Sequence, residues 1–145
     1  MGVFYVFLSF RNVGWSGERT IIVKGGNVFI DNNLFNGTSN FVPLGIIVLR
    51  DLAGASPQAQ GHVYVNVKAS DASAIINIQA TVFADGAVFP YAKDANGNDF
   101  PIDSQSGEPQ FLDGNGNPDP AGFKTTFDCC QLYWQGSIAS EKKLL

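Results

Sequence analysis

Two stretches of the chain repeat the spacing Asp-x-Asn-Gly-Asn, which puts side-chain oxygens at alternate positions of a short loop. Oxygen atoms at that spacing are the ligands that Ca²⁺ takes in tight loops. Asp103 or Glu108 could complete such a site. The sequence therefore offers one set of candidate metal ligands, namely Asp94, Asn96, Asn98, Asp113, Asn115, Asn117 and Asp119.

The two stretches depart from the helix-loop-helix calcium motif, which needs Gly at loop position six and Glu at position twelve. The first stretch has Asp99 and Gln105 at these positions, and the second has Pro118 and Lys124. No helical pattern flanks either stretch. The other interpretation is a pair of Asx and Asn-Gly turns. Calcium is thus the one cofactor that the sequence suggests, and plain turns are the alternative.

Residues for catalysis are few and scattered. His62 is the only histidine, and its place after Gly61 predicts an exposed corner residue. The adjacent Cys129 and Cys130 make a poor metal set, because a structural zinc takes four ligands. The carboxylates that end predicted strands resemble turn residues rather than a glycosidase pair, and they are Asp31, Asp51, Asp71 and Asp85. We predict that the protein is not an enzyme.

The composition narrows the possible classes of protein further. The chain has 145 residues, 45% of them hydrophobic and only 15% charged, with a net charge of −4. This length fits a single domain over 1–145. Nucleic-acid binding is disfavoured because no basic cluster exists. No apolar run reaches membrane-spanning length. The apolar start, Val3–Phe10, lacks a basic leader and a cleavage site, so we interpret it as a strand and not a signal peptide.

Short runs of β-branched and aromatic residues, bounded by Gly, Asn, Asp and Pro, predict an all-β chain. The expected strands are Val3–Phe10, Thr20–Lys24, Asn27–Asp31, Leu44–Arg50, His62–Lys68, Ile75–Ala84, Ala87–Tyr91 and Leu132–Ala139. Several of them alternate, which predicts one buried face and one solvent face. The expected core comprises Ile22, Ile47, Val65, Ile78, Val82, Trp134 and Ile138.

The strands also repeat. Gly45-Ile-Ile-Val follows Thr20-Ile-Ile-Val by about one repeat, and glycine-led strands recur after Gly26, Gly61, Gly86 and Gly136. Periods of this size indicate stacked coils, so we predict a parallel β-helix or solenoid, with an antiparallel β-sandwich as the alternative. The segment 92–124 is rich in Asn, Gly and Pro. We expect it to be a loop insertion that protrudes from one coil.

Four blocks carry a resemblance to a known group. They are SGxxTIIVKGGNVFI, LGIIVLRD, NIxAxVFADG and QLYWQGSIAS, within roughly residues 16 to 140. Together they resemble blocks in large uncharacterised, surface- or envelope-associated proteins of candidate-phylum bacteria. The resemblance implies an extracellular or cell-surface location and no transferable catalytic residues.

We therefore expect a structural or adhesive cell-surface module. The exposed N-terminal strand should pair with a second copy or with a neighbouring protein, because an open strand edge binds other strands. One alternative is a carbohydrate-binding module that presents aromatic rings to glycans, and the candidate rings are Tyr64, Phe83, Tyr91 and Tyr133. The other alternative is a glycan-active enzyme.

Overall fold

The fold is described from a computed structural model. The residues that the structure describes are 7–10, 13–15, 18–31, 33–36, 44–66, 75–91, 101–110, 117, 131–141 and 143–144. Strands dominate these ranges, and the one helix among them is a short 3-10 turn, η1, at Pro57–Ala59.

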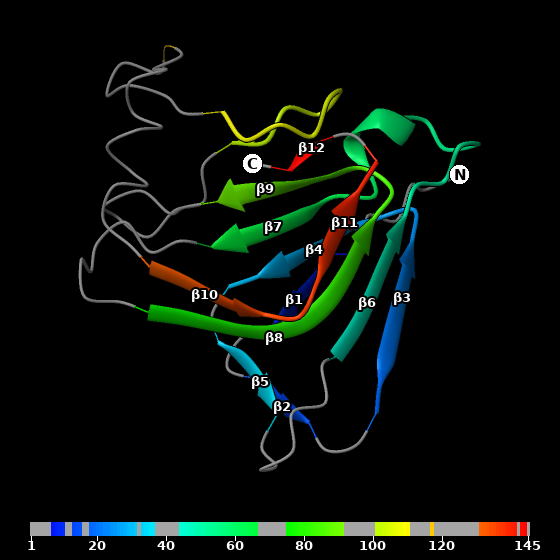
Figure 1. The fold of residues 1–145 in the computed structure, drawn as a ribbon. Helices are drawn as coiled ribbons and strands as arrows, with labels where there is room; N and C mark the ends of the chain where they lie inside the picture. The colour runs from blue at the N-terminus through cyan, green and yellow to red at the C-terminus, as the bar shows by residue number, and fades with distance from the viewer. Residues whose placement is uncertain are drawn as a thin grey trace.

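The strands form two sheets in which every pairing of named strands is parallel (Figure 1). The five-stranded sheet has the order β1-β4-β7-β9-β12, with bounds Phe7–Phe10, Asn27–Ile30, Val63–Asn66, Ala87–Tyr91 and Lys143–Leu144. The seven-stranded sheet contains β2 at Val13–Trp15, β3 at Thr20–Lys24, β5 at Leu34–Asn36, β6 at Leu44–Leu49, β8 at Ile75–Ala84, β10 at Gln131–Gln135 and β11 at Ile138–Ser140. β8 pairs with β5, β6, β10 and β11.

Tight corners connect the two sheets. Gly25 and Gly26 alone separate β3 from β4, and Asp85 and Gly86 alone separate β8 from β9. Consecutive strands can turn this sharply because they enter different sheets. The parallel partner of each strand within its own sheet follows only after a longer connecting segment. Gly25 has a φ of 74°, which explains the choice of glycine there. The corners stack through backbone hydrogen bonds from Gly61 N–H to Gly26 and from Gly86 N–H to Gly61.

The core lies between the sheets and follows the alternation of β8. Ile78, Ala80, Val82 and Ala84 are all buried, as the sequence predicts, and Val65 is buried too. Trp134 and Ile138 are half-buried and pack against this core. A fully buried aliphatic side chain contributes about 1.5–3 kcal/mol, so this row anchors both sheets.

The predicted core was wrong for β3 and incomplete for β6. Ile22 is 65% exposed, and its register partner Ile47 is only half-buried. The buried residues of these strands are Val23, Leu44, Ile46 and Val48. β3 carries three successive apolar residues and β6 carries four, so alternation could not decide which face turns inward.

The expectation that one strand face meets solvent fails for β7. Val63 and Val65 face the core, yet His62 and Tyr64 on the other face are buried as well. Tyr64 belongs to a ladder of rings across β4, β7 and β9. Its ring stacks on Phe29 at 4.6 Å and on Phe89 at 5.8 Å between ring centroids. The ladder forms a second buried cluster with Ala87.

The predicted fold class needs correction. The strands form parallel sheets in an α/β-like arrangement with almost no helix, not the regular β-solenoid that we expected. The physical reason is the uneven excursions between partners. Thr20 pairs with Gly45 at the expected repeat, but Val28 pairs with Val63, and Ala87 pairs with Lys143. The alternative antiparallel sandwich is wrong too, since the only antiparallel contact among the described residues is the isolated Ile102–Pro109 bridge.

The strand positions were largely predictable. The expected strands coincide with β1, β3, β4, β6, β7, β8 and β9 within a few residues. The last one is split into β10 and β11 at Gly136, whose φ is 138°. The short strands β2, β5 and β12 were missed. No helix in the described part of the chain is long and apolar enough to cross a membrane.

Candidate functional site

His62 directly precedes β7 and is buried, with 1% of it exposed, so it is not the exposed corner residue that we expected. Its Nδ1 accepts a hydrogen bond from Ala87 N–H at 2.9 Å, and its Nε2 lies 2.8 Å from the Gln58 carbonyl. Because Nδ1 accepts, Nε2 carries the proton and donates to Gln58. The neighbouring Asn27 side chain accepts from His62 N–H and donates to the Ala59 carbonyl.

Glycines hold the imidazole on both sides. A Cβ on Gly86 would lie 2.5 Å from His62 Nδ1, and a Cβ on Gly107 would lie 2.5 Å from Nε2. Gly107 also has a φ of 76°. The ring therefore fills a slot between the corner before β9 and the loop 101–110, and it pins both to η1.

The loop 101–110 is anchored by Tyr64. The Tyr64 hydroxyl donates a 2.6 Å hydrogen bond to the Gly107 carbonyl in a buried setting. Burial raises the pKa of Tyr64 far above its ordinary value. This loop is the described part of the segment predicted as a protruding insertion. It lies beside β9 and η1 (Figure 1) and covers the outer face of β7.

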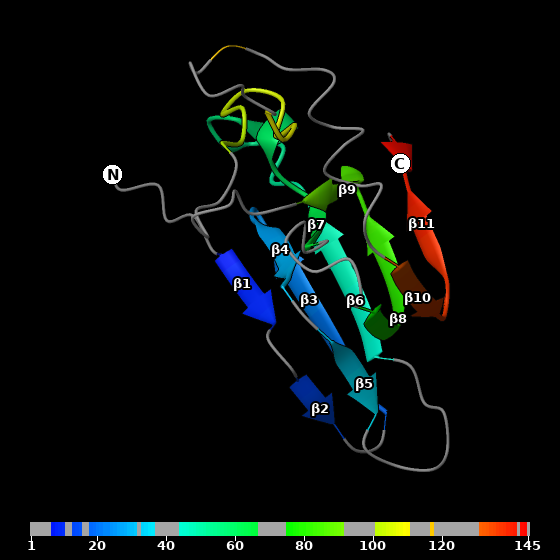
Figure 2. The same ribbon diagram turned by 90° about the vertical axis from the view of Figure 1, so that its left-hand side faces the viewer.

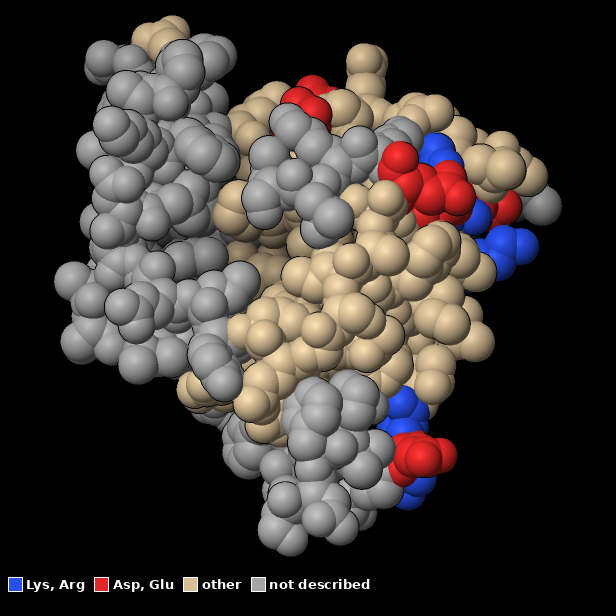
Figure 3. Space-filling model, in the orientation of Figure 1, with Lys and Arg blue, Asp and Glu red and all other residues tan. Residues whose placement is uncertain are grey.

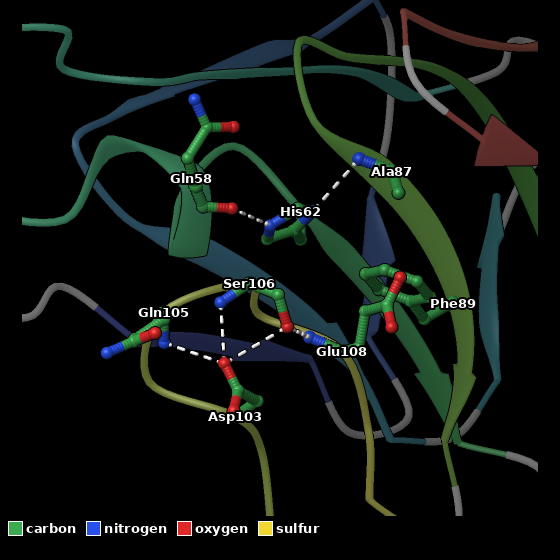
Figure 4. A pocket seen from close by; sticks show the side chains of 8 residues that line it. All are labelled: Gln58, His62, Ala87, Phe89, Asp103, Gln105, Ser106 and Glu108. Carbon is green, nitrogen blue, oxygen red and sulfur yellow. Dashed lines mark hydrogen bonds between the residues drawn. The ribbon is translucent and has the colours of Figure 1, made fainter.

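A cavity of about 630 Å³ opens between this loop, η1 and β9. Figure 4 shows its lining, which includes Glu108 and Phe89. The inner wall is formed by His62, Ala87 and Phe89. The rim is polar and consists of Gln58, Asp103, Gln105, Ser106 and Glu108.

Asp103 shapes the rim. Its Oδ1 accepts from the backbone N–H groups of Gln105 and Ser106 and from the Ser106 hydroxyl. The backbone hydrogen bond from Ser106 is the largest of the effects that lower the pKa of Asp103. The carboxylate thus fixes the turn in its ionised form, and the turn presents Gln105 and Ser106 at the cavity mouth.

His62 does not supply acid–base chemistry to the cavity. Both His62 nitrogens are occupied by backbone partners, so no ring nitrogen is available as a base or metal ligand. The described residues that line the cavity include no lysine or arginine. The cavity combines amide and hydroxyl donors with carboxylate and amide acceptors above an apolar wall, which is the pattern of a small-ligand site.

The strand-end carboxylates that are described act within corners. Asp85 accepts from Arg50 N–H at 3.0 Å and from Arg50 Nη2 at 2.8 Å. The side-chain hydrogen bond from Arg50 is the main cause of the lowered pKa of Asp85. Glu141 Oε2 lies 3.6 Å from the same guanidinium. Asp51 accepts from Ala53 N–H in a turn. Asp31 is also described, half-buried after β4, and Asp71 lies outside the described residues.

The predicted calcium ligands fall almost entirely outside the described residues, and only Asn117 is described, as an exposed bend residue. No group of three or more metal-ligating side chains occurs within the described ranges. Cys129 and Cys130 are not among the described residues either. The calcium interpretation stays a prediction.

The predicted aromatic platform is not formed as expected by the rings that are described. Tyr64 is fully buried under the loop, while Phe83 is 37% exposed on the outer face of β8. The side chains of Tyr91 and Tyr133 lie outside the description. Phe89 and Gln58 at the cavity were not singled out by the sequence, because only the return of the loop 101–110 brings them together.

A second candidate surface is an open edge of the two sheets (Figure 2). It is formed by β1, β2 and β3, each of which pairs with only one other described strand. In β3 the Arg19 carbonyl and the Gly25 N–H bond to β6. Alternate residues of a strand direct their backbone groups to opposite sides. The N–H groups of Thr20, Ile22 and Lys24 therefore point away from β6, where no other described strand pairs.

No family model, curated protein or solved structure matches the chain. The candidate sites therefore stand on their geometry.

Proposed function

We propose that the protein is a non-catalytic structural or adhesive module of a cell surface, and that it associates through the edge of β1, β2 and β3. The observation that carries the proposal is the polarity of the sheets. All named strands pair in parallel, and β10, β11 and β12 end the opposite edge in the same direction as β1, β2 and β3. A second copy could thus add its β10–β12 edge in continuous parallel register.

The two edges offer matching backbone groups. In β11 the Ser137 carbonyl and the Glu141 N–H bond to β8. Ile138 therefore directs its backbone groups outward, as Thr20 and Ile22 do at the other edge. Such a head-to-tail contact is heterologous and does not close, so it would extend into a fibre. A neighbouring surface protein with one free parallel strand could occupy the same edge.

Charge does not block this edge as strongly as in many proteins. Glu18, Arg19 and Lys24 are exposed near β3, and they carry both signs. Figure 3 faces the opposite edge, where β10 and β11 lie, and shows a wide uncharged surface there, with the described charged side chains mainly along the right-hand side. Native sheets commonly protect edges with charged residues, Lys above all, or with Pro. Within Thr20–Lys24 the only such residue is Lys24, at the end of the strand.

The non-catalytic part of the proposal is supported by the site chemistry. The only histidine is committed to backbone partners, and Asp85 is committed to Arg50. A glycan-active enzyme needs two carboxylates that are free to act across a groove, whereas Asp103, one of the two at the cavity rim, is held by the N–H groups of Gln105 and Ser106. The cell-surface location has its support in the sequence resemblance and the weakly charged surface.

Sedimentation velocity over a range of concentrations tests the proposal. The wild-type chain should form larger species as concentration rises. Ile22→Pro removes an outward N–H and places a ring against an incoming strand, so it should reduce association at least about tenfold. Ile22→Ala keeps the N–H and is the matched control. Circular dichroism must show that both variants fold. A wild-type chain that stays monomeric, or equal association in both variants, contradicts the proposal.

A further inference from the structure

We propose that the cavity between β9, η1 and the loop 101–110 binds a neutral, hydroxyl-rich ligand, the chemistry of a monosaccharide unit. This site is separate from the sheet edge proposed for assembly. Its volume of about 630 Å³ lies within the ordinary range for small-ligand pockets.

The polar groups of the rim select the ligand class. Gln58 and Gln105 carry both donors and acceptors, Ser106 carries a hydroxyl, and Glu108 carries a carboxylate. Sugar hydroxyls each donate and accept, so they can use this mixture. An anion would meet two carboxylates, Asp103 and Glu108, and no lysine or arginine is among the described residues of the lining. The lining therefore disfavours phosphates, sulfates and acidic sugars.

The inner wall supplies the apolar surface that the carbon face of a sugar needs. Phe89 and Ala87 form it, and Glu108 lines the same cavity (Figure 4). Phe89 is 3% exposed in this arrangement. A bound sugar would turn the exposed Glu108 side chain toward its hydroxyls and uncover the ring edge.

The site is built rather than incidental, because its walls are held from beneath. Tyr64 fixes the loop at Gly107, and His62 fixes η1 to the start of β9. Asp103 fixes the turn that presents Gln105 and Ser106. A rigid frame lowers the ordering cost of binding, which matters for a ligand that makes only a few hydrogen bonds.

Two-dimensional ¹H–¹⁵N NMR titration with the methyl glycosides of glucose, galactose, mannose and N-acetylglucosamine tests this inference. At least one of them should give saturable shifts confined to Gln58, Ala87 and residues 103–108. The double variant Gln105→Ala, Glu108→Ala should weaken binding at least about tenfold, since two hydrogen bonds are lost. Ser104→Ala is the control in the same turn, outside the cavity lining, and should leave binding unchanged.

Several results would overturn the inference. One is the absence of shifts with every glycoside at tens of millimolar. Another is a double variant that binds the glycoside as tightly as the wild type and the Ser104→Ala control do. A third is saturable binding of spermidine or CaCl₂ in place of any glycoside, which would assign the rim carboxylates to a cation. Sedimentation of the same double variant separates the two proposals, because its self-association should match the wild type.

Discussion

Replacing Tyr64 by Phe removes one hydroxyl and keeps the ring that stacks between Phe29 and Phe89. The hydroxyl donates to the Gly107 carbonyl at 2.6 Å, in a buried setting. Without it the carbonyl loses a buried partner, which costs about 1–3 kcal/mol. We expect Tyr64→Phe to lower the free energy of unfolding at pH 7 by this amount in urea titrations. Thr81→Val removes a hydroxyl at an exposed position and should change stability by less than about 0.5 kcal/mol.

The same variant makes a second, pH-dependent prediction. Burial raises the pKa of Tyr64 well above its ordinary value. A raised pKa means that the folded state holds the phenol proton more tightly than the unfolded state does. This stability is fully present below the unfolded pKa of about 10 and is lost as pH rises above it, by about 1.4 kcal/mol per pH unit. The Tyr64→Phe variant has no phenol at this position and therefore lacks this pH-dependent stability.

The gap in stability between wild type and Tyr64→Phe should therefore shrink as pH rises from about 9 to 11. Urea unfolding followed by circular dichroism at several pH values measures it. A gap that stays constant over this range would refute the burial of the phenol. A Tyr64→Phe variant as stable as the Thr81→Val control at pH 7 would show that the loop 101–110 is not anchored through Gly107.

Four further predictions concern stability and metal binding. Ile78→Ala should cost about 2–5 kcal/mol in urea unfolding because Ile78 is fully buried, whereas Ile22→Ala should cost less than about 0.5 kcal/mol; equal costs would reverse the assignment of faces. Gly136→Ala should destabilise by more than about 3 kcal/mol, since its Cβ would lie 2.0 Å from the Ala80 carbonyl oxygen and its φ is 138°; an unchanged melting temperature would contradict the split between β10 and β11. The lowered pKa of Asp85 gives stability that is present above its unfolded pKa of about 4 and is lost as pH falls through the folded value. Asp85→Asn should therefore flatten the acid side of the plot of stability against pH. An unaltered acid side would argue against the Arg50 contact. Millimolar Ca²⁺ should leave the melting temperature unchanged if residues 94–119 form plain turns, and a rise would assign the Asp and Asn residues there to a metal site.

The strands could be predicted because each leaves a local signature. Alternation in Ile75–Ala84 gave the correct buried face, and Gly26 and Gly86 marked corners that need tight turns. Ile22 could not be placed, because apolar residues on both faces of a strand remove the alternation on which the prediction depends. The short strands β2, β5 and β12 carry too few residues for any periodic signal.

The cavity could not be predicted from local sequence patterns. His62 looked like an exposed corner residue, because nothing in its neighbourhood announces the loop 101–110 that covers it. The φ of Gly107 and the hydrogen bond to Tyr64 depend on residues far apart in the chain. The regular coil repeat failed for a related reason. A period read from matching strands takes no account of the long excursions between them, which tertiary packing accommodates at little entropic cost.

Hydrogen exchange at the open edge tests the proposed assembly most directly. The N–H groups of Thr20, Ile22 and Lys24 point away from β6, so they should exchange fast in dilute protein. At high concentration they should become protected as an incoming strand bonds to them, while Ile21 and Val23, which bond toward β6, should exchange slowly at both concentrations. Protection that is identical at low and high concentration, in a sample that sediments as a monomer, would contradict association through this edge.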